Sequence, residues 1–226
     1  TAVGALSLSK ITTNGTCTAV GYSALKNNTT GAQNTALGAN ALTALSSGSQ
    51  NVAVGYNAAR QITSGINNTA VGWRALDSDQ TSSNNTAIGV QAMFANTTGT
   101  KNVAVGANAL DANTTASNNT AVGKDALTAN TTGDSNNGFG ESALASNTTG
   151  SDNNAFGVNA LVTVTTGSNN CAFGRSALGF TTTASNNSAF GHNALNANTT
   201  GADNVAVGAL ALDANTTASS NTAVGY

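Results

Sequence analysis

Residues 119–135 read Asn-Thr-Ala-Val-Gly-Lys-Asp-Ala-Leu-Thr-Ala-Asn-Thr-Thr-Gly-Asp-Ser, and variants of this unit fill the chain. Gly123 within it belongs to a series of glycines that recurs at every seventeenth position, from Gly4 to Gly225. Thirteen consecutive repeats therefore pass without an insertion or a deletion. Tandem coils must stack in register on their neighbours, whereas separate domains tolerate length changes in their loops. We therefore expect residues 1–226 to form a single uninterrupted array with one coil per repeat.

The other repeat positions favour strands over helices. An apolar residue such as Val122 or Phe156 stands directly before the glycine, and Ala and Leu follow it at the third and fourth positions. Val, Phe and Thr favour strands, whereas the Gly and Asn-Thr-Thr of each repeat would interrupt a helix. The sequence thus predicts an all-β fold, a parallel β-solenoid or β-roll of about 13 coils, each with two or three short strands and tight turns.

The Ala-Val doublets, such as Ala104-Val105, do not alternate apolar and polar residues as a strand with one wet face would. We expect the Val/Phe and Leu side chains to point inward, and the Ala side chains to lie at a seam between chains. The core of one chain is also thin compared with the entropy lost on ordering each repeat, which favours an oligomer. On this hypothesis Ala104→Glu weakens assembly by several kcal/mol, whereas Ala107→Glu costs almost nothing.

Stacking of coils places equivalent residues in files, which makes further predictions. Phe139, Phe156, Phe173 and Phe190 should form one file of stacked rings. Triplets such as Asn28-Thr29-Thr30 are formal glycosylation acceptors, yet stacked Asn and Thr ladders explain them without sugars. Cys17 and Cys171 lie nine coils apart, about 43 Å at the strand spacing, so we expect no disulfide within the chain.

We call the glycine that recurs at every seventeenth position, such as Gly123, the main glycine. The position directly after it is the most variable in the repeat and should face solvent. Two interpretations stay open for it. Its aromatic members form a surface-contact column for a sugar or a receptor, or the column is an unconstrained surface. The candidate contact residues are Tyr22, Tyr56, Trp73 and His192.

The composition excludes several functional classes. One His, nine acidic and seven basic residues are few groups from which to build a catalytic site, so we expect no enzyme and no cofactor. We also expect no metal site, because His192 has no Cys, Asp or second His at ligand spacing. A formal charge of −2 gives no reason to expect a nucleic-acid partner. The apolar runs are too short for a membrane span.

The unit from Asn119 to Gly133 resembles the repeats of bacteriophage tail-fibre proteins and related bacterial fibre proteins. Its Ala-Val-Gly core is also similar to the head repeats of trimeric autotransporter adhesins. That second resemblance implies a left-handed β-roll with three chains side by side. No catalytic residue is carried over from either family.

We therefore expect a structural shaft segment of an extracellular, cell-surface or virion fibre. Its chains would associate as a homotrimer or filament, and any receptor or glycan would bind through regions outside this chain. No polar cap is visible at either end of the array, so we expect an excerpt of a longer fibre. Two alternatives remain: an ice-binding solenoid, although only one of two adjacent Thr can point outward, and an adhesin whose shaft itself binds glycans or surfaces.

Overall fold

The computed structural model describes residues 1–13 and 15–226, which form two compact units, Thr1–Thr115 and Ala116–Tyr226. We call them unit 1 and unit 2. The described residues form short strands and turns and contain no helix. Each unit is a parallel β-solenoid with one coil per sequence repeat, so the predicted fold class is confirmed.

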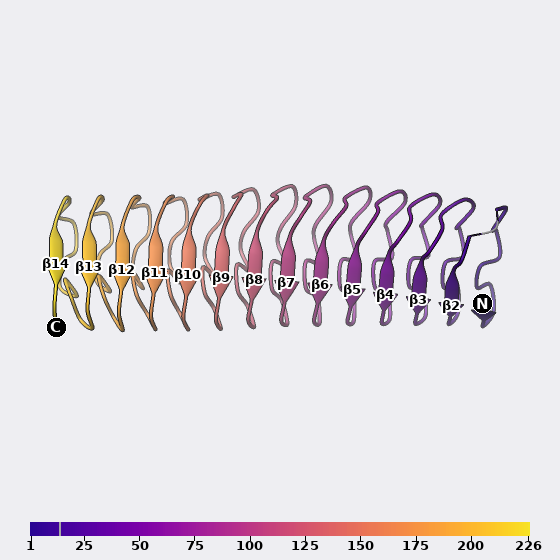
Figure 1. Ribbon diagram of the computed structural model, residues 1–226, viewed down its shortest axis with the longest axis horizontal. Coiled ribbons are helices and arrows are strands. Elements are labelled where there is room, and N and C mark those ends of the chain that lie inside the picture. Colours follow the sequence, from indigo (N-terminus) through magenta and orange to yellow (C-terminus); the bar gives the residue numbers. More distant parts are fainter. Residues whose placement is uncertain (14) are drawn as a thin grey trace. The chain divides into compact units, whose positions relative to one another are not determined.

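Each coil contributes one strand of two or three residues, and neighbouring strands in a unit lie side by side in sequence order (Figure 1). Within each unit, paired strands are parallel and join equivalent residues of successive repeats, for example Ala19 with Ala36. The strands of unit 1 are β1 (Ala2–Val3), β2 (Thr18–Val20), β3 (Thr35–Leu37), β4 (Val52–Val54), β5 (Thr69–Val71), β6 (Thr86–Ile88) and β7 (Val103–Val105). Those of unit 2 are β8 (Thr120–Val122), β9 (Asn137–Phe139), β10 (Asn154–Phe156), β11 (Cys171–Phe173), β12 (Ser188–Phe190), β13 (Val205–Val207) and β14 (Thr222–Val224).

The prediction of two or three strands per coil is wrong, because the chain turns repeatedly after the main glycine. Gly21 has a φ of 133°, and the second and fourth residues after it, Ser23 and Leu25, have φ values of 56° and 51°. The Ala24 amide donates to the Gly21 carbonyl at 3.3 Å, and the Lys26 amide donates to the Ser23 carbonyl at 3.2 Å. These are overlapping β-turns with a positive φ at the third residue, as type II turns require. A left-handed residue at every second position prevents a strand.

Hydrogen bonds between coils nevertheless continue through the turns. The Leu25 amide donates to the Ala41 carbonyl at 3.0 Å, and the Thr29 amide donates to the Ser46 carbonyl at 2.9 Å. Backbone groups that a longer strand would have paired are therefore satisfied by the next coil. The stack is held along most of each coil and not only at its strand.

The core consists of Ala and Leu side chains. Every Ala at the middle of a strand from β2 to β13 is fully buried, apart from β9, where Gly138 takes its place. The Leu residues four positions after the main glycine are also fully buried from Leu25 to Leu195, whereas Leu8 and Leu212 in the terminal coils are partly buried. The prediction of an inward Leu file is confirmed. The prediction of an inward Val/Phe file and an Ala seam is wrong: the two outer residues of each strand point away from the core.

The strand length explains this reversal. In a three-residue strand the first and third side chains share one face, and the middle side chain has the other face to itself. The middle residue is the small one, and it packs on leucine. A Cβ built on Gly138, which takes the place of the usual Ala, would lie 3.6 Å from Leu127.

An asparagine ladder runs beside this core, as predicted for the Asn positions. We call the buried asparagines that directly precede the strands the inner Asn file. In unit 2, the Asn136 amide donates to the Asn119 side-chain oxygen at 2.8 Å, and the Asn136 side-chain nitrogen donates to the Gly150 carbonyl at 2.8 Å. Each side chain thus bonds the coils on both sides of it. A second position of buried asparagines includes Asn28 and Asn113, whose side chains are inaccessible to solvent in the folded chain.

Candidate functional site

The predicted surface column faces solvent. Tyr56 has 52% of its surface exposed, and Tyr22, Trp73 and His192 are also exposed. Tyr56 and Trp73 belong to neighbouring coils of unit 1, whereas Ala39 separates Tyr22 from Tyr56 in the same file. His192 lies in unit 2. The four residues therefore do not form one continuous aromatic surface.

A more continuous surface lies on the strands. We call it the outer face; it consists of the first and third residues of each three-residue strand. Leu37 is 46% exposed and Phe190 is 40% exposed. The third residue is apolar in every such strand, and neither position carries a charged side chain. The outer face is thus an uncharged, largely apolar surface in each unit.

The phenylalanines of unit 2 are stacked on this face, as predicted. The ring centroids of Phe139 and Phe156 are 4.7 Å apart, those of Phe156 and Phe173 are 4.5 Å apart, and those of Phe173 and Phe190 are 5.2 Å apart. The planes of each pair lie within 9° of parallel. The rings therefore form one aromatic file along the outer face.

Both cysteines are free thiols. Cys171 is the first residue of β11 and lies on the outer face, where partial burial raises the pKa of its thiol. Cys17 takes a position in the inner Asn file, and its sulfur accepts a hydrogen bond from the Asn28 side chain at 3.6 Å. One thiol therefore belongs to the surface and the other to the core.

Two arginines and one aspartate form a cluster in unit 1 that the sequence analysis missed. The Asp77 side chain is fully buried and accepts bonds from Arg60 Nε at 2.8 Å and from Arg74 Nε at 2.9 Å. The Arg74 guanidinium also lies over the Phe94 ring, 4.5 Å from its centroid. Arg60 and Asp77 occupy the same position in successive repeats, and that shared position is the signal that could have revealed the pair.

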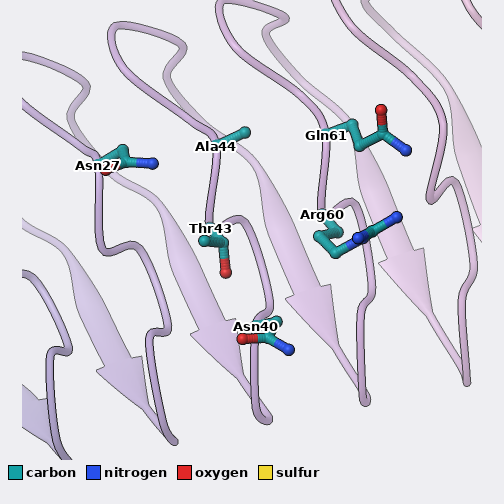
Figure 2. A pocket seen from close by; sticks show the side chains of 6 residues that line it. All are labelled: Asn27, Asn40, Thr43, Ala44, Arg60 and Gln61. Atoms are coloured by element: carbon teal, nitrogen blue, oxygen red, sulfur yellow. The ribbon is translucent and has the colours of Figure 1, made fainter.

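A polar groove of about 580 Å³ opens beside Arg60. Its middle coil contributes the short side chains Thr43 and Ala44, while the coils on either side contribute longer ones (Figure 2). Asn27 stands on one side and the Arg60-Gln61 pair on the other. The complete lining is Asn27, Asn40, Thr43, Ala44, Arg60 and Gln61.

A second buried carboxylate, Asp79, lies in the core of unit 1. It occupies a file in which Asn96 and Asn113 follow. Burial raises its pKa, although the Ser82 hydroxyl and amide and the Asn96 side chain donate hydrogen bonds to it and oppose that shift. Asp79 therefore stands at the beginning of a run of amides, because the preceding coil has Ile62 in the same file.

Among residues 1–13 and 15–226, no group of three or more His, Cys, Asp and Glu side chains is placed to hold a metal ion. The same residues include no helix that is long and apolar enough to cross a membrane. Comparisons of this chain with protein-family models, with curated proteins and with solved structures found no match.

Proposed function

We propose that this chain is a structural shaft segment of an extracellular or virion fibre, which holds a distal binding element. Copies of the chain would associate through the outer face. The observation that carries the proposal is the outer face itself, because a single chain leaves a continuous, uncharged apolar file at least partly exposed in each unit. Exposed apolar surfaces of this kind mark interaction sites.

A further copy of this chain is the partner that fits best. The outer face repeats once per coil, so a complementary surface must present side chains at that same spacing. Another copy has this spacing throughout its length. The flat stack of Phe139, Phe156, Phe173 and Phe190 offers particularly close packing to an identical face.

Parallel association supports a base-to-tip fibre. Rotation about an axis along the stacking direction keeps every chain pointing the same way. The resemblance to the adhesin head repeats favours three chains. A three-residue strand is about 10 Å wide and coils are about 4.8 Å apart, so each coil contributes only about 50 Å² of face. Association should therefore be weak per coil and accumulate along the stack.

The Ala104→Glu variant does not test assembly. Ala104 is fully buried within its own chain, so a glutamate there would disrupt the core. Phe156→Glu is the appropriate variant, because it places a charge on the outer face. Thr149→Glu is its matched control, because Thr149 is exposed and lies in a turn away from the strands.

Sedimentation equilibrium over a range of concentrations tests the proposal. We expect the wild-type chain to sediment as a multiple of 22.0 kDa. Phe156→Glu should weaken association by roughly tenfold or more, with an unchanged circular dichroism spectrum, and Thr149→Glu should behave like wild type. A wild-type monomer at all concentrations, or normal assembly of Phe156→Glu, would contradict the proposal.

An ice-binding function is a second candidate, supported by a file of exposed hydroxyls. Thr98 is exposed, whereas the hydroxyl of Thr97 donates to the Thr114 carbonyl at 3.0 Å within the stack. One outward hydroxyl per coil thus faces solvent, as the sequence predicts. Thermal hysteresis of the purified chain would distinguish this function, because a shaft segment should produce none.

A further inference from the structure

The charges of this chain are unevenly distributed. Unit 1 carries five Lys or Arg and three Asp, whereas unit 2 carries two Lys or Arg and six Asp or Glu. Within unit 1, the segment that precedes Asp77 contains Lys10, Lys26, Arg60 and Arg74 and no acidic residue. The polar groove beside Arg60 lies in this basic segment. Its surroundings therefore favour an anionic ligand.

Arg60 is held in place before any ligand arrives. Its Nε donates a hydrogen bond to Asp77, which also accepts one from Arg74. The two guanidinium groups and the one carboxylate together carry one net positive charge. Within the described part of the chain, the Nη groups of Arg60 have no hydrogen-bond partner, and 39% of the side-chain surface is exposed. The Nη groups are therefore available to a ligand, while the arginine has little freedom left to lose on binding.

The rest of the groove offers amides and a hydroxyl. The side-chain amides of Asn27 and Gln61 make no hydrogen bond with the described residues and lie on opposite sides of Ala44 (Figure 2). Thr43 donates its hydroxyl to the Ser23 carbonyl at 3.0 Å, which leaves its oxygen able to accept. Such groups bind the hydroxyls of a sugar, since an amide both donates and accepts.

We propose that this groove binds a saccharide that carries a carboxylate. Guanidinium Nη groups pair with a carboxylate, and Asn27, Gln61 and Thr43 bind ring hydroxyls. A volume of about 580 Å³ falls within the range of small-ligand sites and accommodates one or two sugar units. This inference does not depend on whether the chain assembles into a fibre.

Three small probes separate recognition of a carboxylate from recognition of ring hydroxyls. Saturation-transfer NMR titrations of the full chain would compare glucuronate, methyl glucoside and acetate. We expect glucuronate to bind more tightly than either of the others, because only glucuronate offers both a carboxylate and ring hydroxyls. Equal binding of acetate would indicate a simple anion site and would overturn the proposal, as would equal binding of methyl glucoside or no binding of glucuronate.

Three variants test the residues. Arg60→Gln should weaken glucuronate binding by roughly tenfold or more, because a charge-assisted pair is lost. Ala44→Gln should block the groove without disturbing the fold, because Gln61 already occupies the same file one coil later. Arg175→Gln removes an exposed arginine of unit 2 and should leave binding unchanged. Undiminished binding by the folded Ala44→Gln variant would place the ligand elsewhere.

Discussion

At the scale of the residue, the buried leucines occupy an unusual backbone conformation. Leu25, Leu110 and Leu127 have φ values of 51° to 52°. A left-handed conformation costs about 1–2 kcal/mol for a residue with a Cβ, whereas full burial of a leucine contributes about 1.5–3 kcal/mol. All three side chains are fully buried, so burial can offset the conformational cost. Their position in the core therefore explains why leucine is accepted there.

Two glycines in one coil provide a matched pair of substitutions. Gly140 has a φ of 133°, and a Cβ there would lie 2.6 Å from the Gly157 carbonyl. Gly138 replaces the usual strand alanine, and its Cβ would meet nothing closer than 3.2 Å. We expect Gly140→Ala to reduce the free energy of unfolding by about 3 kcal/mol and Gly138→Ala to change it by less than about 1 kcal/mol. Denaturant unfolding measures the free energy of unfolding of both variants. Equal losses would show that Gly140 is not required for its positive φ and its close approach to Gly157.

Asp79 provides a prediction about pH. Because burial raises its pKa, the folded chain binds this proton more tightly than the unfolded chain does. Its contribution to stability therefore increases as the pH falls from neutral through the folded-state pKa, towards the unfolded value of 3.8. The neighbouring Asp77 carboxylate points to Arg60 and Arg74 instead.

Asp79→Asn should extend the run of amides that begins at Asn96 by one coil and raise the melting temperature at neutral pH. Asn96 and Asn113 already occupy the same file, which indicates that the site accepts an amide. The advantage over wild type should shrink as the pH falls, because the wild-type carboxyl then becomes neutral as well. Thermal unfolding from pH 7 downwards measures both curves. If the melting-temperature difference between Asp79→Asn and wild type stays constant or grows in acid, burial of Asp79 does not raise its pKa in the folded chain.

At the scale of the coil, stability depends on register. The inner Asn file and the inter-coil amide bonds connect equivalent positions of successive repeats, so a coil can be removed whole without changing which repeat positions meet. Deletion of residues 154–170 removes one whole coil of unit 2 and joins Asn153 to Cys171 in the correct phase. We expect that variant to remain folded, with a modest fall in melting temperature.

Deletion of Thr163 alone should be far more damaging, although it removes a single residue instead of a whole coil. Every later residue of the coil would then meet the wrong neighbour, and inward side chains would face outward. Circular dichroism melts of the two deletions make the comparison. If both melt alike, stacking in phase is not what organises the chain.

The period, the parallel stacking, the inward leucines and the phenylalanine file could all be predicted, because each follows from spacing along the chain. The orientation of the Ala-Val doublet could not be predicted. Both residues are apolar, so either side chain could point into the core of its own chain. The strand length decides it, and the turns that limit strands such as β8 to three residues depend on left-handed Ser, Asn and Leu residues. The frequent Asn, Asp and Ser two positions after the main glycine are a signal of those turns. The groove beside Arg60 depends on which coils carry short side chains, and no periodic pattern indicates that.

At the scale of the molecule, the reversed Ala-Val doublet moves the interface that we propose between chains to the other side of the strands. The alanines are already buried within each chain, so we expect another copy to meet the outer face instead. In the proposed shaft, the stacking of coils within each chain provides the stiffness. The chains associate through the outer face, which lies on the side of the strands opposite the alanine core. Charged residues stand elsewhere on the coil, so salt should affect assembly little.

Hydroxyl-radical footprinting of the wild-type chain at low and high concentration tests this account most directly. As concentration rises, we predict that Phe139, Phe156, Phe173 and Phe190 become protected from oxidation, while Tyr56 and Trp73 remain as reactive as before. Phenylalanine reactivity that does not change with concentration, or protection of Tyr56 and Trp73 instead, would contradict the claim that chains meet through the outer face.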